Sequence, residues 1–167
     1  MASKIKVKCQ ELTNNITIDV LQVLHVFGVA CSKVQKNSST KEVLVFCNSY
    51  DQLDKLFSSD CISALKAIGC FPKIPPQLKA RRTVIIRSVD EFIYEKDENE
   101  ILAEVKLKNS SLNAVEVFKF SKGRNIKITF DNQTMANQCK QNGLTLYYFE
   151  LCPNGIQGED YIFKCYT

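Results

Sequence analysis

The residues of this chain best suited to chemistry are its lysines and arginines, which gather in two stretches of the second half. One stretch surrounds the start of an expected strand, and the other occupies an expected hairpin. Cationic side chains at this density suit contacts with phosphate groups. Any one of them is more simply a solubilising surface charge, but the set favours phosphate contact. The eight residues are Lys79, Arg81, Arg82, Arg87, Lys119, Lys122, Arg124 and Lys127.

Groups that could catalyse a reaction are few. The single histidine, His25, lies in an apolar helical pattern, where we expect a partly buried structural residue. The six glycines form no phosphate-binding loop. The acidic stretch 90–104 could hold a cation, but its spacing better fits a solvated loop and a helix N-terminus. We therefore predict no enzyme activity and no cofactor.

The eight cysteines mostly stand inside apolar runs, which favours buried free thiols over disulfides. No Cys-x-x-Cys pair is complete, so no metal site is predicted within these residues. No apolar run reaches the roughly 18 residues that a membrane span needs, so we expect no membrane partner. The formal charge of +4 permits a phosphate-bearing partner without requiring one.

The first half of the chain reads as β-α-β-β-α-β. Residues 4–9 alternate basic and apolar side chains, which is typical of a strand with one face on a core. The helices are expected at 16–28 and from about 51 to 69, where Gly28 and Gly69 are plausible ends. The other strands are expected at 29–34, 42–47 and 70–71.

The prolines at 72–76 interrupt this pattern, and the same order of elements then repeats. Strands are expected at 83–89, 112–120, 125–130 and 144–151, and helices at 97–107 and 134–141, the latter ending at Asn142-Gly143. The predicted class is α+β, with two tandem ferredoxin-like domains that resemble RNA-recognition motifs. The predicted bounds are 1–74 for the first domain, 75–82 for a proline-rich and basic linker, and 83–164 for the second domain.

RNA-recognition motifs stack bases on aromatic residues of the two central strands. In the second domain, Asn125 and Lys127 occupy the equivalent positions, with Ile85 and Arg87 beside them. In the first domain, Leu44 and Phe46 point outward, and the candidate contacts are Lys6, Lys8 and Phe46. Because neither domain has the standard aromatic platform, we expect contact with the nucleic-acid backbone to dominate.

The stretch from Lys41 to Thr167 resembles the Gag-like, first-open-reading-frame proteins of invertebrate LINE-type, non-LTR retrotransposons. The similarity lies in EVLVFCNSYDQLDKLF (Glu42–Phe57), IPPQLKARRTVIIRSVD (Ile74–Asp90), GRNIKITFDN (Gly123–Asn132) and the ending CYT. In that family, zinc knuckles follow tandem RNA-recognition-like domains. The resemblance therefore implies that 165–167 begin such a knuckle and that Cys165 is its first zinc ligand.

The resemblance also implies a function. It predicts a protein that coats single-stranded RNA of its own element, or DNA, in a cytoplasmic ribonucleoprotein that can also be nuclear. It further implies self-association and nucleic-acid chaperone activity. An alternative is a protein-interaction and multimerisation module, because RNA-recognition-like domains without stacking aromatics can present their faces to protein partners.

Overall fold

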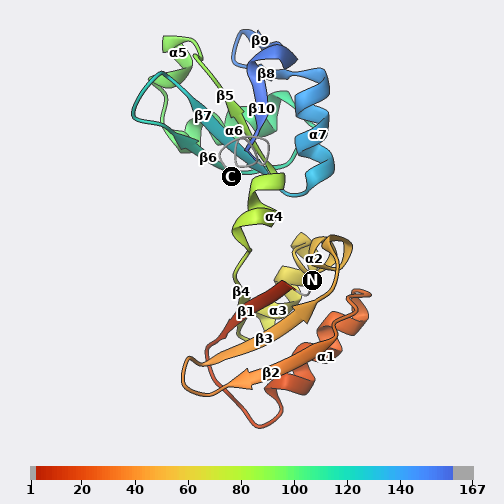
Figure 1. Cartoon of the computed structure of the whole chain (residues 1–167). Coiled ribbons are helices and arrows are strands. Elements are labelled where there is room, and N and C mark those ends of the chain that lie inside the picture. Colours follow the sequence, from red (N-terminus) through yellow and green to blue (C-terminus); the bar gives the residue numbers. More distant parts are fainter. Residues whose placement is uncertain (1–2, 160–167) are drawn as a thin grey trace. The chain divides into compact units, whose positions relative to one another are not determined.

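The computed structural model describes residues 3–159 (Figure 1). The chain divides after Leu78 into two compact parts, which we call unit 1 and unit 2. Cys165 and the expected start of a zinc knuckle lie outside the described residues. Within them, no helix is both long and apolar enough to cross a lipid bilayer.

Unit 1 is a four-stranded antiparallel sheet in the order β2-β3-β1-β4. Alternation of lysines and apolar residues along β1 buries Ile5 and Val7 against the helices, where they meet Leu24, Leu53 and other core residues. The elements are β1 (Ser3–Cys9), α1 (Ile16–Val26), β2 (Lys33–Asn37), β3 (Glu42–Cys47), α2 (Tyr50–Leu56), α3 (Ser59–Ala67) and β4 (Cys70–Pro72).

Two details of unit 1 differ from the expectations. The second strand was expected at 29–34 and lies at Lys33–Asn37, paired with β3. The helix expected from about 51 to 69 is two helices, because the Ser58 side chain accepts a hydrogen bond from Cys61 N and starts α3 anew.

The segment expected to be a linker, 75–82, contains the helix α4 (Pro76–Arg81). A proline at the first helical position loses no hydrogen bond, because that N–H has no partner within the helix. Leu78 is fully buried in the unit 1 core. The boundary between the two units falls inside this segment, which is helical.

Unit 2 repeats the same topology with a second antiparallel sheet in the order β10-β5-β7-β6. The helices α6 and α7 pack on one face of it through Ile101, Val105, Ala136 and Cys139. The elements are β5 (Thr83–Ile86), α5 (Glu91–Tyr94), α6 (Glu98–Lys108), β6 (Ala114–Lys119), β7 (Ile126–Phe130), α7 (Gln133–Asn142), β8 (Leu144–Leu146), β9 (Phe149–Leu151), a 3-10 turn η1 (Pro153–Gly155) and β10 (Ile156–Gly158).

The last strand of unit 2 is not where the sequence placed it. Residues 144–151 fold back on themselves as the hairpin β8–β9, with Leu144 opposite Leu151 and Tyr147 at a positive φ of 53° in the turn. The strand that completes the sheet is β10, which pairs with β5. The helix stop at Gly143 is confirmed, since its φ is 81° and a Cβ there would lie 2.3 Å from the Leu151 oxygen.

Both units therefore have the strand order 4-1-3-2 of the β-α-β-β-α-β fold, which confirms the predicted α+β class. The seven described cysteines are free thiols, and five of them are buried. Cys9 and Cys70 face each other on β1 and β4 with their sulfurs 3.7 Å apart.

Candidate nucleic-acid interface

In unit 2, the sheet face opposite α6 and α7 carries a row of side chains that crosses all four strands. The strand register aligns Phe118 on β6, Lys127 on β7, Ile85 on β5 and Gln157 on β10. None of these belongs to the unit 2 core, whereas their neighbours Val84, Ile86, Ile126 and Ile128 do. We call this surface the unit 2 face.

Two aromatic rings stand at the β6 edge of this face. Phe118 and Phe120 lie edge to face with ring centres 5.4 Å apart, and Phe118 is 44% exposed. The Lys127 ammonium lies 5.3 Å from the centre of the Phe118 ring and 3.3 Å from Glu159 Oε1. A ring beside a cation can stack on a base while the cation contacts the neighbouring phosphate.

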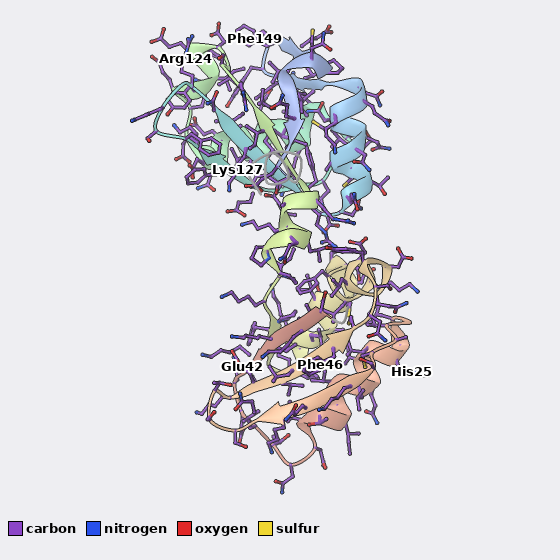
Figure 2. The ribbon with its side chains drawn as sticks, in the orientation of Figure 1. His25, Glu42, Phe46, Arg124, Lys127 and Phe149 are labelled. Atoms are coloured by element: carbon purple, nitrogen blue, oxygen red, sulfur yellow. The ribbon has the colours of Figure 1, made fainter. Side chains whose placement is uncertain are left out.

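Basic residues border the aromatic pair at the hairpin end of the sheet. Arg87 is exposed just beyond β5, and Lys122 and Arg124 are exposed in the turn between β6 and β7. Backbone hydrogen bonds hold these segments together, from Val89 N to Arg124 O and from Phe120 N to Asn125 O. Figure 2 labels Arg124 in this turn and Lys127 on β7. The end of the face nearest Phe120 is therefore strongly basic.

The other end of the unit 2 face is covered. The hydroxyl groups of Thr83 and Thr129 lie 2.8 Å apart and are buried, and Thr83 also donates to Lys79 O in α4. The Lys79 ammonium forms an ion pair of 2.7 Å with Glu116 on β6. A ligand on this face would therefore bind toward the hairpin end.

The corresponding face of unit 1 is basic and less aromatic. Register pairs Lys4 with Phe46, Lys6 with Leu44 and Lys8 with Glu42. On the outer strand, Lys33 pairs with Phe46, and its ammonium lies 5.9 Å from the Phe46 ring centre. Figure 2 labels Phe46 and Glu42 on β3. We call this the unit 1 face, and the outward orientation predicted for Leu44 and Phe46 is confirmed.

Two of the predicted basic contacts have structural roles instead. Arg82 is 4% exposed and donates from Nη1 to Asp131 O at 2.9 Å. Lys119 lies on the helix side of β6, where its ammonium donates to Tyr94 O and Lys96 O at 3.0 and 2.8 Å. Both predictions fail for the same reason, since an ammonium or guanidinium group held by main-chain oxygens inside the fold does not face a ligand.

The other predicted contacts remain at the surface. Arg81 is half-buried at the end of α4, and Lys79 is half-buried in its ion pair with Glu116. The structure brings together one set around the hairpin end of unit 2 and a separate set on unit 1. The first set is Arg87, Lys122, Arg124 and Lys127, and the second is Lys6, Lys8 and Phe46.

The structure also shows the positions of the residues considered for catalysis, His25 and the acidic stretch 90–104. His25 is exposed in the last turn of α1, so the expectation of partial burial was wrong. In the acidic stretch, Asp90 caps α5, and Asp97 forms a capping box with Glu100 at the start of α6. That confirms the interpretation of this stretch as helix N-termini. Among residues 3–159, no three potential metal ligands cluster.

A second aromatic group of unit 2 comes from α5 and the turn between β8 and β9. Phe92 on α5 contacts Tyr147 edge to face at 5.5 Å and Tyr148 at 6.4 Å, and the Lys96 ammonium lies 4.6 Å from the Phe92 ring centre. Tyr148 is 92% exposed. Partial burial, together with Glu100 and Glu104, raises the pKa of Tyr147.

Similarity to known proteins lies among solved structures. No family model and no curated protein matches the chain. Solved structures with similarity include the three N-terminal RNA-binding domains of the yeast splicing factor Prp24, at 13% identity and a TM-score of 0.34, covering 92% of this chain and 64% of that one. The NONO-1 homodimer of C. elegans has 9% identity and a TM-score of 0.35, covering 92% of this chain and 59% of that one.

Aspartokinase III of E. coli is also similar, at 10% identity and a TM-score of 0.36, over 82% of this chain and 29% of the enzyme. The chain thus spans less than two thirds of each of these three. Likeness at this level carries no functional argument, and the fold class rests on the strand order. The resemblance to retrotransposon proteins stays a prediction.

Proposed function

We propose that this chain binds single-stranded nucleic acid on its sheet faces. The observation that carries the proposal is the pair of exposed Phe118 and half-buried Phe120 beside Lys127, bordered by Arg87, Lys122 and Arg124. Rings offer stacking to any base, and the cations suit the phosphates between bases. Because stacking and phosphate contacts do not depend on the identity of the base, we expect such a site to bind strands of any sequence.

The arrangement departs from the usual RNA-recognition motif. There the stacking aromatics come from the two central strands, which in unit 2 are β5 and β7. Here those strands supply Ile85 and Lys127, and the aromatics come from the edge strand β6. We infer that bases stack near the β6 edge and that the strand runs toward the hairpin.

A direct test is fluorescence anisotropy of the full chain with a labelled mixed-sequence 20-nucleotide RNA, the same DNA and the matching duplex, each at 50 and 200 mM salt. We expect both single strands to bind more tightly than the duplex. Affinity should fall as salt rises, because each phosphate contact releases counterions. Absence of binding at 50 mM salt, or affinity independent of salt, would overturn the proposal.

On the resemblance of residues 41–167 to retrotransposon Gag-like proteins, we further propose that the bound RNA is packaged into a ribonucleoprotein. That role includes chaperone activity, which a strand-annealing assay with complementary oligonucleotides would detect. We propose binding without catalysis, for which the residue inventory is the support. Intact RNA after incubation with the chain and Mg²⁺ is the expected result.

A protein-interaction role is the second candidate, and the exposed group Phe92, Tyr147 and Tyr148 favours it. Aromatic side chains are enriched at protein interfaces. Light scattering of nuclease-treated chain over a range of concentrations would detect self-association. The two roles are compatible, because a coat protein contacts both RNA and its own copies.

A further inference from the structure

A groove runs beside β1 on the unit 1 face, and three of its seven lining residues are lysines. It encloses about 300 Å³ and lies between β1 and the segment that follows β4. Lys4 and Lys6 project from β1, where the alternating residues Ile5 and Val7 are buried. The lining residues are Lys4, Lys6, Lys73, Ile74, Pro75, Pro76 and Gln77.

The outer wall of this groove is fixed in place at both ends. Lys73 N donates to Lys6 O at 2.9 Å, which extends the pairing of β4 with β1 by one residue. Further along, Ile74 packs against the unit 1 core, and Leu78 is fully buried in it. The adjacent prolines Pro75 and Pro76 restrict the backbone between these anchors. The wall is therefore organised before any ligand arrives.

The lysines of the groove have no carboxylate partner in the described part of the chain. Lys79 and Lys127 form ion pairs, but both belong to unit 2. Along the strand positions of the unit 1 face, Glu42 is the one carboxylate, and it lies opposite Lys8 rather than in the groove. The groove thus concentrates positive charge from Lys4, Lys6 and Lys73 without internal neutralisation.

An apolar row lies directly beside the charged one. Phe46 is the register partner of Lys4, and Leu44 is the partner of Lys6. Phe46 is half-buried and Leu44 is 9% exposed, so they present a shallow surface rather than a pocket. A single strand has the matching layout, with a line of phosphates on one side and base faces on the other.

We propose that this groove holds consecutive phosphodiesters of a single-stranded nucleic acid. The inference rests on the proposed function and deepens it, because it gives the two units different chemistry. Unit 1 binds the backbone through point charges, whereas the unit 2 face binds bases through Phe118 and Phe120. Lysine ammonium groups recognise phosphate by charge without reading sequence, so the groove is indifferent to the bases.

The test separates backbone from bases with two probes, an oligo(dT) 20-mer and an abasic phosphodiester strand of equal length. The variant is K4Q/K6Q/K73Q in the full chain. Its affinity for both probes at 0.1 M salt should fall about 10- to 100-fold. The slope of log affinity against log salt should also shrink by about 2, because each of the three lost phosphate contacts contributes about 0.7 on single strands. F118A should weaken oligo(dT) binding and leave abasic binding unchanged.

A matched control removes three lysines from the helix side of unit 1. Lys36 pairs across from Val43 on that side, and Lys55 and Lys66 lie on α2 and α3. K36Q/K55Q/K66Q has the same net charge as the groove variant and should keep nearly all the affinity. Equal losses in the two triple variants would overturn the groove and leave only a diffuse charge effect.

The remaining outcomes are distinct. If the unmodified chain binds neither probe, the proposed function itself fails. If it binds oligo(dT) but K4Q/K6Q/K73Q has unchanged affinity and salt slope, the groove fails and nucleic-acid binding stands. Polyglutamate of equal charge should compete poorly with the abasic strand. Competition as strong as that of unlabelled abasic strand would show a site for acidic peptide and overturn the assignment to phosphodiesters.

Discussion

The Lys127 ammonium lies 5.3 Å from the centre of the Phe118 ring, across the pairing of β7 with β6. The same ammonium lies 3.3 Å from Glu159 Oε1. Phe118 and Lys127 thus form one amphipathic surface, on which the ring can stack with a base and the ammonium can contact the adjoining phosphate. In the proposed complex, Glu159 would compete with that phosphate for Lys127.

Replacing the aromatic pair should weaken binding without changing its dependence on salt. We expect F118A and F120A each to lose about 1–3 kcal/mol of binding free energy with oligo(dT), because stacking contributes that much per base. Anisotropy titrations at several salt concentrations would measure both quantities. F92A is a matched control, since Phe92 is 41% exposed against 44% for Phe118 but lies on α5. An equal loss in F92A would contradict the assigned stacking site.

Removing the carboxylate that holds Lys127 should strengthen binding. E159Q frees the ammonium for phosphate and removes a negative charge from the unit 2 face. We expect about a two- to fivefold gain in affinity, since an ion pair that is partly exposed contributes at most about 1 kcal/mol. E150Q, at an exposed position of the β8–β9 hairpin, is the charge-matched control and should change little. An unchanged affinity in E159Q would mean that Lys127 does not contact the strand.

The aromatic pair was not predictable from alternation along the sequence, and the cause is a single bulge. Leu112 and Ala114 are buried, so strict alternation would bury Phe118 and Phe120 with them. The register shifts between Ala114 and Glu116, and the extra residue reverses which side chains face the helices. The same shift turns Lys119 inward, which is why its predicted role failed.

Where no such irregularity intervenes, the sequence pattern was sufficient. The strand expected at 42–47 is β3 with the same bounds. The outward orientation of Phe46 followed from the alternation of side chains along this strand. Tertiary contacts decided the remaining cases. Arg82 carries no local sign of its burial, which comes from the distant Asp131 oxygen. Short segments such as β10 have too few residues for a pattern to show.

Substitutions of Lys119 and Lys122 should have opposite effects, one on the stability of the fold and the other on nucleic-acid binding. Lys119 is bonded to two main-chain oxygens and lies 5.2 Å from the Tyr94 ring centre, whereas Lys122 is exposed in the next turn. K119M should lower the free energy of unfolding by about 1–2 kcal/mol, because these charge-assisted hydrogen bonds are only partly buried. Its affinity for single strands should stay unchanged.

K122M should behave the other way, with normal stability and a salt slope smaller by about 0.7. Urea unfolding followed by circular dichroism and anisotropy titrations on the same samples would measure both effects. The distinction would be wrong if K119M bound more weakly while remaining as stable as the unmodified chain.

The buried thiols should make the chain less stable in alkali. Burial raises the pKa of Cys47 and Cys61 to about 11 and of Cys70 and Cys139 to about 12, from an ordinary value of 9.0. Below pH 9 the thiols are protonated in both the folded and unfolded chain. Above it, the unfolded chain releases protons that the native chain retains, so stability falls between about pH 9 and 12.

Each such thiol contributes a slope of about 1.4 kcal/mol per pH unit within that window. Above pH 9, the free energy of unfolding of C139A, measured with urea, should therefore fall less steeply with pH than that of the unmodified chain. The small cavity left by the substitution lowers the stability at pH 7 but does not affect this slope. C152A is the control, because Cys152 is exposed, and it should keep the full decline. Parallel curves for C139A and the unmodified chain would show that this thiol ionises equally readily in both states.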